Sequence, residues 1–255
     1  MPRTSRNGRA RLPSWMRPAR RHTPPPADPL PATMPSATAP PLPSPTSGSI
    51  LRDWRVPLGV DIHDGQSVTV DFDRDAHLLM QGELGWSIGP TMDAVLDHIL
   101  ARGAHLDLVT GIASLAGRFT DSPRMSHYTE TEAAEAVEAF HASMVNAGAP
   151  AHPEDHRFLM IDGLNLLHAD ARDGDLRAEN ALDLLYALIV SGRRSGHHIV
   201  AHDWSLHCNR TPALDRLRAA FPAVLESVKP QKHFEDRAVL LAHTGAHGLR
   251  LPRTA

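Results

Sequence analysis

The chain is poor in lysine, and this scarcity limits how a phosphate-binding segment in it can work. Of its 26 basic residues only Lys229 and Lys232 are lysines, and both lie towards the C-terminal end. In phosphate-binding loops of the form GxxxxGK[ST], a lysine neutralises charge on the outer phosphates. Any glycine-rich loop earlier in this chain would therefore lack that cation.

Cysteine and long apolar segments are scarce as well. The single Cys208 excludes an internal disulfide and favours a reducing compartment. The longest apolar run, Leu184 to Val190, is far shorter than the roughly 18 residues that a membrane-spanning helix needs. We therefore expect a cytoplasmic protein without a membrane span.

Charge divides the chain into two unequal parts. Residues 1–48 contain seven arginines against the single acid Asp28, a formal charge of +6, and thirteen of the 22 prolines. The rest carries 19 basic and 28 acidic side chains, a formal charge of −9. We expect residues 1–48 to be a disordered basic, proline-rich tail, with weak nucleic-acid contact as the alternative. The acidic body argues against strong binding to a phosphate backbone.

From Arg55 onwards, short apolar strands alternate with longer helical stretches. This pattern predicts an α/β fold with a mostly parallel sheet and helices on both faces. The expected strands are 56–62, 67–72, 77–81, 106–109, 158–161, 198–201 and 224–228; the expected helices are 90–102, 130–146, 178–191 and 214–220; and 238–251 closes the fold. We place one domain at residues 51–255.

The segment 77–91, HLLMQGELGWSIGPT, is an apolar strand followed by a degenerate phosphate-binding loop. Ile88 and Gly89 occupy the positions of the lysine and of the hydroxyl that holds magnesium. Glu83 would repel a phosphate, and Pro90 lacks a backbone donor near the helix start. The residues of this degenerate nucleotide site are Gly82, Gly85, Ser87, Ile88 and Gly89.

Four segments in order resemble the motor domain of the FtsK/HerA group of DNA-translocating ATPases, which includes conjugation and type VII secretion relatives. They are VPLGVD at 56–61, HLLMQG at 77–82, FLMID at 158–162 and GRRSGHH at 192–198. The resemblance runs from about Val56 to the C-terminus. It implies a RecA-like P-loop fold, with Asp162 at the end of the Walker B strand.

The chain departs from the pattern of this family at its catalytic positions. The glutamate that the family has after the Walker B aspartate, where it activates the attacking water, is Gly163 here. The strand that follows the GRRSGHH turn begins near His198 and ends in Asp203 and Trp204, where the family has a polar Thr-Gln sensor. By this resemblance Asp162 could act only as a weak metal ligand.

These departures predict a hydrolysis-deficient structural or regulatory subunit. We expect it to act beside an active FtsK-type ATPase in DNA-transfer, chromosome-partition or secretion machinery, with any DNA contact indirect. No cofactor is required, and weak binding of ATP and magnesium stays open, as does a homo-oligomer. One alternative is a divergent ATP-binding translocase that is active only as an oligomer, with an arginine supplied in trans. The other is an adaptor that works through its proline-rich tail.

Other side-chain groups suggest sites that we weighed against simpler explanations. A zinc site lacks paired ligand spacing, a solvated polar loop is the simpler interpretation of the acids after the Walker B strand, and a hydrolytic triad lacks a GxSxG elbow. Trp86 would fill the vacated phosphate pocket or contact a partner. The residues concerned are His197, His198, His202, His207 and Cys208 for zinc; His168, Asp170, Asp173 and Asp175 for a divalent ion; and Asp203, Ser205 and His207 for the triad.

Overall fold

The computed structural model describes residues 54–82, 88–112, 115–117, 122–204, 212–228 and 237–251. All of them belong to one compact unit. The proposed tail at 1–48 and the loop residues 83–87 lie outside the described residues, as do Ser205, His207 and Cys208. The boundary that we placed at residues 48–51 stays a prediction.

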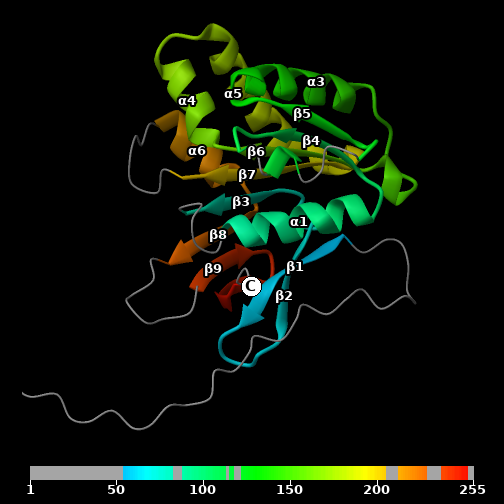
Figure 1. Cartoon of the computed structure of the whole chain (residues 1–255), viewed down its shortest axis with the longest axis vertical. Coiled ribbons are helices and arrows are strands. Elements are labelled where there is room, and N and C mark those ends of the chain that lie inside the picture. Colours follow the sequence, from blue (N-terminus) through cyan, green and yellow to red (C-terminus); the bar gives the residue numbers. More distant parts are fainter. Residues whose placement is uncertain are drawn as a thin grey trace, which may run out of the picture. The chain divides into compact units, whose positions relative to one another are not determined.

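The described residues form one ten-stranded sheet with the order β2-β1-β10-β9-β8-β3-β7-β6-β4-β5. The strands are β1 (Arg55–Asp61), β2 (Ser67–Asp71), β3 (Leu78–Gln81), β4 (His105–Val109), β5 (Met125–Tyr128), β6 (Arg157–Asp162), β7 (His197–Asp203), β8 (Ala223–Val228), β9 (Arg237–Ala242) and β10 (Gly245–Arg250). From β8 to β5 every neighbouring pair is parallel, whereas β8, β9, β10, β1 and β2 pair antiparallel. The predicted α/β fold with a largely parallel sheet is confirmed (Figure 1).

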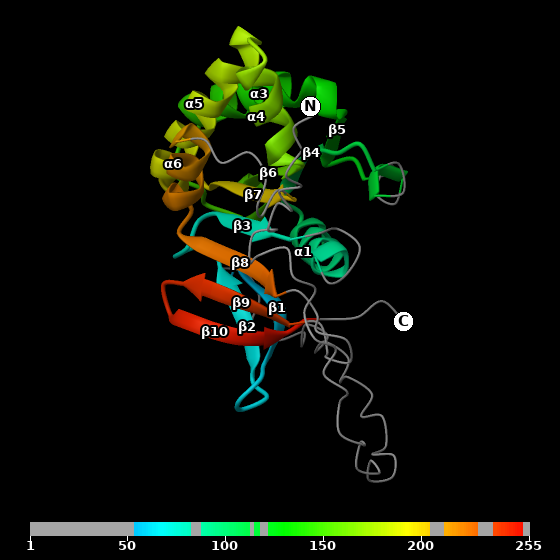
Figure 2. The same ribbon diagram turned by 90° about the vertical axis from the view of Figure 1, so that its left-hand side faces the viewer.

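Helices cover both faces of the parallel strands. They are α1 (Gly89–Ala101), α3 (Ala133–Val145), α4 (Leu164–Arg172), α5 (Leu176–Ser191) and α6 (Pro212–Ala220), with short 3₁₀ turns η3 (Glu130–Glu132), η4 (Pro153–Asp155) and η5 (Gly192–Ser195). Figure 2 shows α1 on one side of the strands and α5 and α6 on the other. Within the described part of the chain, no helix combines the length and apolar composition that crossing a bilayer requires.

Two hydrophobic cores result, because successive side chains of a strand point to opposite faces. In β6, Phe158 and Met160 pack in the core beneath α1, whereas Leu159 and Ile161 pack beneath α3, α5 and α6. All four side chains are buried. A run of consecutive apolar residues is the expected pattern for a strand that is covered on both sides.

Two local predictions were wrong or incomplete. The proposed polar loop after β6 is helix α4, which contains His168 and Asp170. Its residues Leu164, Leu167 and His168 are buried at helical spacing. Asp175 caps the next helix, because its side chain accepts hydrogen bonds from the backbone N–H groups of Arg177 and Ala178. Strand β5 was not predicted at all.

Burial, partial for His98 and nearly complete for His77 and His198, favours the neutral form of several histidines. Burial lowers the pKa of His77 to about 3. Burial, with a smaller contribution from the charge of Arg102, lowers the pKa of His98 to about 4. Burial also holds the pKa of His198 well below its usual value. Each of these rings takes up a proton more readily in the unfolded chain than in the folded one.

We predict that the free energy of unfolding falls as the pH drops from about 6.5 towards 4. Between the folded and unfolded pKa values the unfolded state binds more protons, so stability is complete above the unfolded value and is lost below it. Each fully buried histidine contributes about 1.4 kcal/mol per pH unit in this window. Urea unfolding at a series of pH values measures the slope. The variant His98→Leu should flatten it, the control His63→Ala at an exposed position should not, and a pH-independent stability would contradict the prediction.

Candidate functional site

The carboxyl ends of four parallel strands meet at one edge of the sheet. Register places Gln81 of β3 beside Asp203 of β7, and Asp162 of β6 beside His202 of β7. Strand β4 ends next to β6 at Val109. The residues that follow these strands therefore converge, and they include Gly82, Thr110 and Gly163. In open α/β sheets this edge is where ligands bind.

Gly82 is required directly after β3 because of a close approach by β8. Its φ is 153°, and a Cβ added there would lie 2.0 Å from Oγ of Ser227. Its backbone N–H donates to the carbonyl of Asp203 at 3.2 Å. Gly85, Trp86 and Ser87 follow outside the described residues, so the proposal that Trp86 fills the phosphate pocket stays a prediction.

Ile88 and Gly89 lie where the sequence placed the missing lysine and hydroxyl. Ile88 is the N-cap residue of α1, and its side chain is completely buried in the core that α1 covers. Pro90 follows near the start of the helix. An apolar side chain that is directed into the core cannot neutralise a phosphate, so this helix start contributes no side-chain charge to the edge.

A buried chain of hydrogen bonds joins the ends of all four strands. Nδ1 of His202 lies 2.9 Å from Oδ1 of Asp162, and its Nε2 lies 2.9 Å from the carbonyl oxygen of Gly82. The hydroxyl of Thr110 donates to Oδ2 of Asp162 at 3.0 Å. At most 2% of Thr110, Asp162 and His202 is exposed. Both oxygens of Asp162 are therefore occupied by side chains of the same chain.

The hydrogen-bond partners of His202 determine how many protons His202 and Asp162 carry together. The Gly82 carbonyl can only accept, so Nε2 of His202 must carry a hydrogen. If Nδ1 and Oδ1 both lacked a proton, two lone pairs would face each other at 2.9 Å. The pair therefore shares one proton, either as imidazolium and carboxylate or as imidazole and carboxylic acid. In both forms Asp162 and His202 together carry no net charge.

The second acid at this edge, Asp203, is also neutralised within the chain. Nε of Arg218, from α6, donates to Oδ2 of Asp203 at 2.7 Å. The side chain of Asp203 is fully buried and that of Arg218 is 11% exposed. His168 of α4 lies nearby, and burial, followed by the charges of Arg172 and Arg218, lowers its pKa.

Gly163 adopts the left-handed conformation, with φ 96° and ψ 47°, and leads straight from β6 into α4. A Cβ at this position would lie 3.1 Å from Cδ1 of Leu166 and 3.6 Å from Cζ2 of Trp204. Any L-residue, including the glutamate that the resemblance leads one to expect, would be strained in this turn. Trp204 stacks near His202 with a ring separation of 6.4 Å.

The structure brings together only part of the predicted site. Gly82, Ile88, Asp162, Gly163, Asp203 and Trp204 lie at or beside the carboxyl edge. His198 lies at the opposite end of β7, where its Nδ1 hydrogen bonds the carbonyl of Ala76. His198 and His202 therefore do not converge on one ion. Among the described residues, no three His, Cys, Asp or Glu side chains are grouped to hold a metal.

Thr110, Arg218 and the pairing of His202 with Asp162 were missed by sequence reasoning. Thr110 could have been found from the sequence, because it is a polar residue that directly follows a buried strand. The pairing of His202 depends on strand register, which places His202 opposite Asp162. Arg218 lies on α6, and its ion pair depends on how that helix packs.

Comparisons with solved structures give the fold. The second and third ATPase domains of EccC from Thermomonospora curvata, in complex with a signal sequence peptide, match with a TM-score of 0.58 and 18% identity, covering 79% of this chain and 41% of that one. The cytoplasmic domain of this type VII secretion ATPase matches with a TM-score of 0.60 and 18% identity, covering 79% of this chain and 26% of that one. The chain has a RecA-like P-loop fold.

A third P-loop structure agrees with this assignment. The pCW3 conjugation coupling protein TcpA, in its monomer form with ATPγS, matches with a TM-score of 0.60 and 12% identity, covering 77% of this chain and 65% of that one.

This chain spans about two fifths of the length of the first EccC structure and about a quarter of the second. A comparison of the sequence with protein-family models gave no match, and no curated protein matches it.

We predict that His202→Phe lowers the free energy of unfolding by about 3–5 kcal/mol, because it leaves the Asp162 carboxyl buried without its partner. The double variant Asp162→Leu/His202→Phe should recover more than half of that loss, since both partners become apolar. Urea unfolding of the single and double variants measures the coupling. The control is His105→Phe at an exposed strand end. Additive single effects would contradict the pairing.

Proposed function

We propose that this chain is a P-loop subunit that does not hydrolyse nucleotide and that works through protein contacts. The observation that carries the proposal is the His202 ring, which bonds both Asp162 and the Gly82 carbonyl. In P-loop enzymes the Walker B aspartate holds Mg²⁺ and needs a free ionised carboxylate. Here that carboxylate is neutralised from inside the fold.

The described residues do not fit a magnesium nucleotide. Mg²⁺ binds charged oxygen ligands in octahedral geometry, and both oxygens of Asp162 are engaged by Thr110 and His202. Ile88, at the lysine position, is completely buried in the apolar core. Gly163 replaces the carboxylate that would activate water, in a turn that favours glycine. No step of nucleotide hydrolysis can be derived from these groups.

We propose an active ATPase domain of FtsK type as the partner, in cytoplasmic machinery for DNA transfer, partition or secretion. The EccC match supports this, because that structure contains two ATPase domains and this chain covers 41% of it. Trp204 leaves 37% of its surface exposed beside Gly163 and offers an apolar contact at the same edge. The chain would then contribute a rigid P-loop fold to the assembly while the partner hydrolyses ATP.

We predict that ATP with magnesium binds with a dissociation constant above about 1 mM. A dissociation constant of about 1 mM corresponds to a binding free energy of about −4 kcal/mol. Calorimetric titration measures the affinity, and phosphate release measures turnover. The variant Asp162→Asn should change neither quantity, and the control Asp61→Asn, on β1, should behave in the same way.

Two outcomes of that experiment would overturn the proposal. Magnesium-dependent hydrolysis that Asp162→Asn abolishes would identify an active site that uses this carboxylate. ATPase activity that appears only in a DNA-stimulated oligomer would favour the divergent translocase. The adaptor hypothesis concerns the tail, outside the described residues, and stays a prediction that deletion of residues 1–48 tests.

A further inference from the structure

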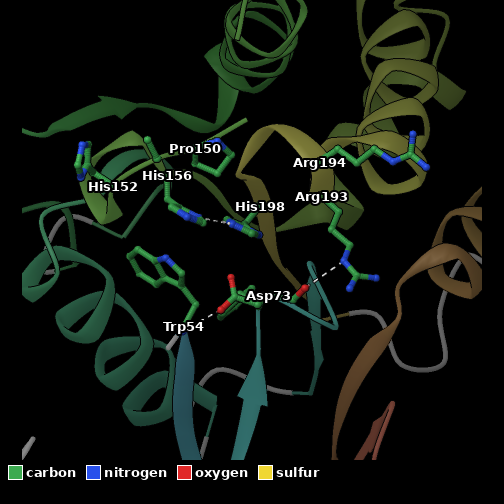
Figure 3. Close-up of a pocket in the computed structure, with 10 residues that line it drawn as sticks. Trp54, Asp73, Pro150, His152, His156, Arg193, Arg194 and His198 are labelled. Atoms are coloured by element: carbon green, nitrogen blue, oxygen red, sulfur yellow. Dashed lines mark hydrogen bonds between the residues drawn. The ribbon is translucent and has the colours of Figure 1, made fainter. Parts of the chain in front are cut away.

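A cavity of about 580 Å³ lies at the opposite, amino end of the parallel strands. It opens where β6 and β7 begin, so it is separate from the edge that contains Asp162. Figure 3 shows the labelled side chains around it, contributed by β7 and by the segments before β1, after β2, before β6 and after α5. The lining residues are Trp54, Phe72, Asp73, Pro150, Ala151, His152, His156, Arg193, Arg194 and His198.

Two of these histidines form a hydrogen-bonded pair whose tautomers are determined by a carbonyl. Nδ1 of His198 lies 2.8 Å from the carbonyl oxygen of Ala76, so this nitrogen must carry the hydrogen. His198 is 1% exposed, and its burial keeps the ring neutral, which leaves a lone pair on Nε2. Nδ1 of His156 lies 2.9 Å from that atom and must donate to it.

The hydrogen bond to His198 determines the tautomer of His156, which lines the cavity. When this ring is neutral, its hydrogen is on Nδ1 and its Nε2 is a hydrogen-bond acceptor. No side chain or backbone N–H among the described residues donates to Nε2 of His156. The ring packs against Trp54, with centroids 4.9 Å apart and an angle of 41° between the ring planes. A buried histidine that fixes the tautomer of a second one is the arrangement by which proteins orient a functional imidazole.

The carboxylate of Asp73 provides a second acceptor in the same cavity. One of its oxygens receives only a long hydrogen bond, at 3.4 Å, from the backbone N–H of Trp54. Figure 3 shows this carboxylate directed towards the pair of His156 and His198. The two acceptors form one half of the cavity, and a group that fills it must bring donors, preferably with a positive charge.

Arginines provide the other half. Nε of Arg193 donates to the backbone carbonyl of Asp73 at 3.0 Å, which anchors the side chain at the rim of the cavity. The two terminal nitrogens of this guanidinium have no hydrogen-bond partner among the described residues, and Arg194 lines the same cavity. A guanidinium is the preferred protein partner of a carboxylate or phosphate.

We propose that this cavity binds a small zwitterion, with an ammonium group between His156 and Asp73 and a carboxylate at Arg193. The volume is within the usual range of small-molecule pockets. The apolar surfaces of Trp54, Phe72 and Pro150 accommodate the carbon skeleton of the ligand. Nothing in the proposed P-loop function requires this site, so either proposal can fail without the other.

The arrangement implies a pH dependence. Burial lowers the pKa of His156, while the charges of Asp73 and Asp155 oppose that effect and His197 adds to it. The other groups facing the ring are His198 and, across the cavity, Arg193 and Arg194. Protonation of His156 would place a second positive charge beside the ammonium group and remove the acceptor. Affinity should be constant near neutral pH and fall only below about 6.5, the ordinary histidine value.

The experiment is calorimetric titration of the full chain with L-leucine and with γ-aminobutyrate, which differ in the spacing of their charges. N-acetyl-L-leucine lacks the ammonium group and L-leucinamide lacks the carboxylate. We expect saturable binding of at least one of the two amino acids. Each of the two leucine derivatives should bind about tenfold or more weakly than leucine itself, the loss expected for one charge-assisted hydrogen bond.

Variants separate the two halves of the cavity. His156→Phe keeps an aromatic ring beside Trp54 but removes the acceptor. Arg193→Gln, at an exposed position, removes the guanidinium and leaves the core unchanged. Each should weaken binding about tenfold or more, whereas Arg172→Gln on α4, outside the cavity, should not. Absence of binding, equal affinity for the blocked derivatives, or unchanged affinity in Arg193→Gln would overturn the proposal.

Discussion

The hydrogen bonds of the His202 ring are the interaction on which the carboxyl edge of the sheet depends. One side chain at the end of β7 bonds a carboxylate from β6 and the carbonyl that follows β3. The ring therefore ties together the ends of three neighbouring parallel strands where a P-loop enzyme would hold its nucleotide. Thr110 adds the end of β4 through the second oxygen of Asp162. The polar groups of Asp162, His202 and Gly82 at this edge therefore hydrogen bond within the protein.

This closure has an energetic consequence for any ligand. A cation that needed the Asp162 carboxylate would have to displace a buried histidine and leave Nε2 and the Gly82 carbonyl to find other partners. Removing one member of a buried pair costs several kcal/mol, comparable to the whole binding free energy of a millimolar ligand. Asp203 is likewise engaged in a buried pair, with Arg218. The two acids that the sequence offers to a nucleotide site are thus both committed to the fold.

Most of the architecture could be predicted because it depends on local patterns. The apolar runs at β3 and β6 and the helical spacing of Met92, Val95 and Ile99 are read directly from the sequence. Strand β5 was not predicted because its residues 125–128, MSHY, are half polar. The strand lies at the exposed edge of the sheet, where no apolar run is required. Helix α4 was mistaken for a loop because the acids Asp170, Asp173 and Asp175 follow β6 closely, and only the buried residues of the helix mark it as one.

The site was harder to predict than the fold, for a different reason. Its residues come from four strands, and their contacts depend on register, which a one-residue shift would reverse. Asp162 and Gly82 could be found from their motifs. The partner of Asp162 could not, because histidines are abundant in this chain, and no local pattern distinguishes His202 from His197 or His198.

The most direct test of this account is nitrogen-15 NMR of the histidine side chains at neutral pH, with and without magnesium and ATP. The account predicts that Nε2 of His202 carries a slowly exchanging hydrogen, that Nδ1 shares a proton with Asp162, and that millimolar magnesium nucleotide leaves both signals unchanged. A His202 ring with a rapidly exchanging Nε2 hydrogen, or one that magnesium nucleotide displaces from Asp162, would contradict it.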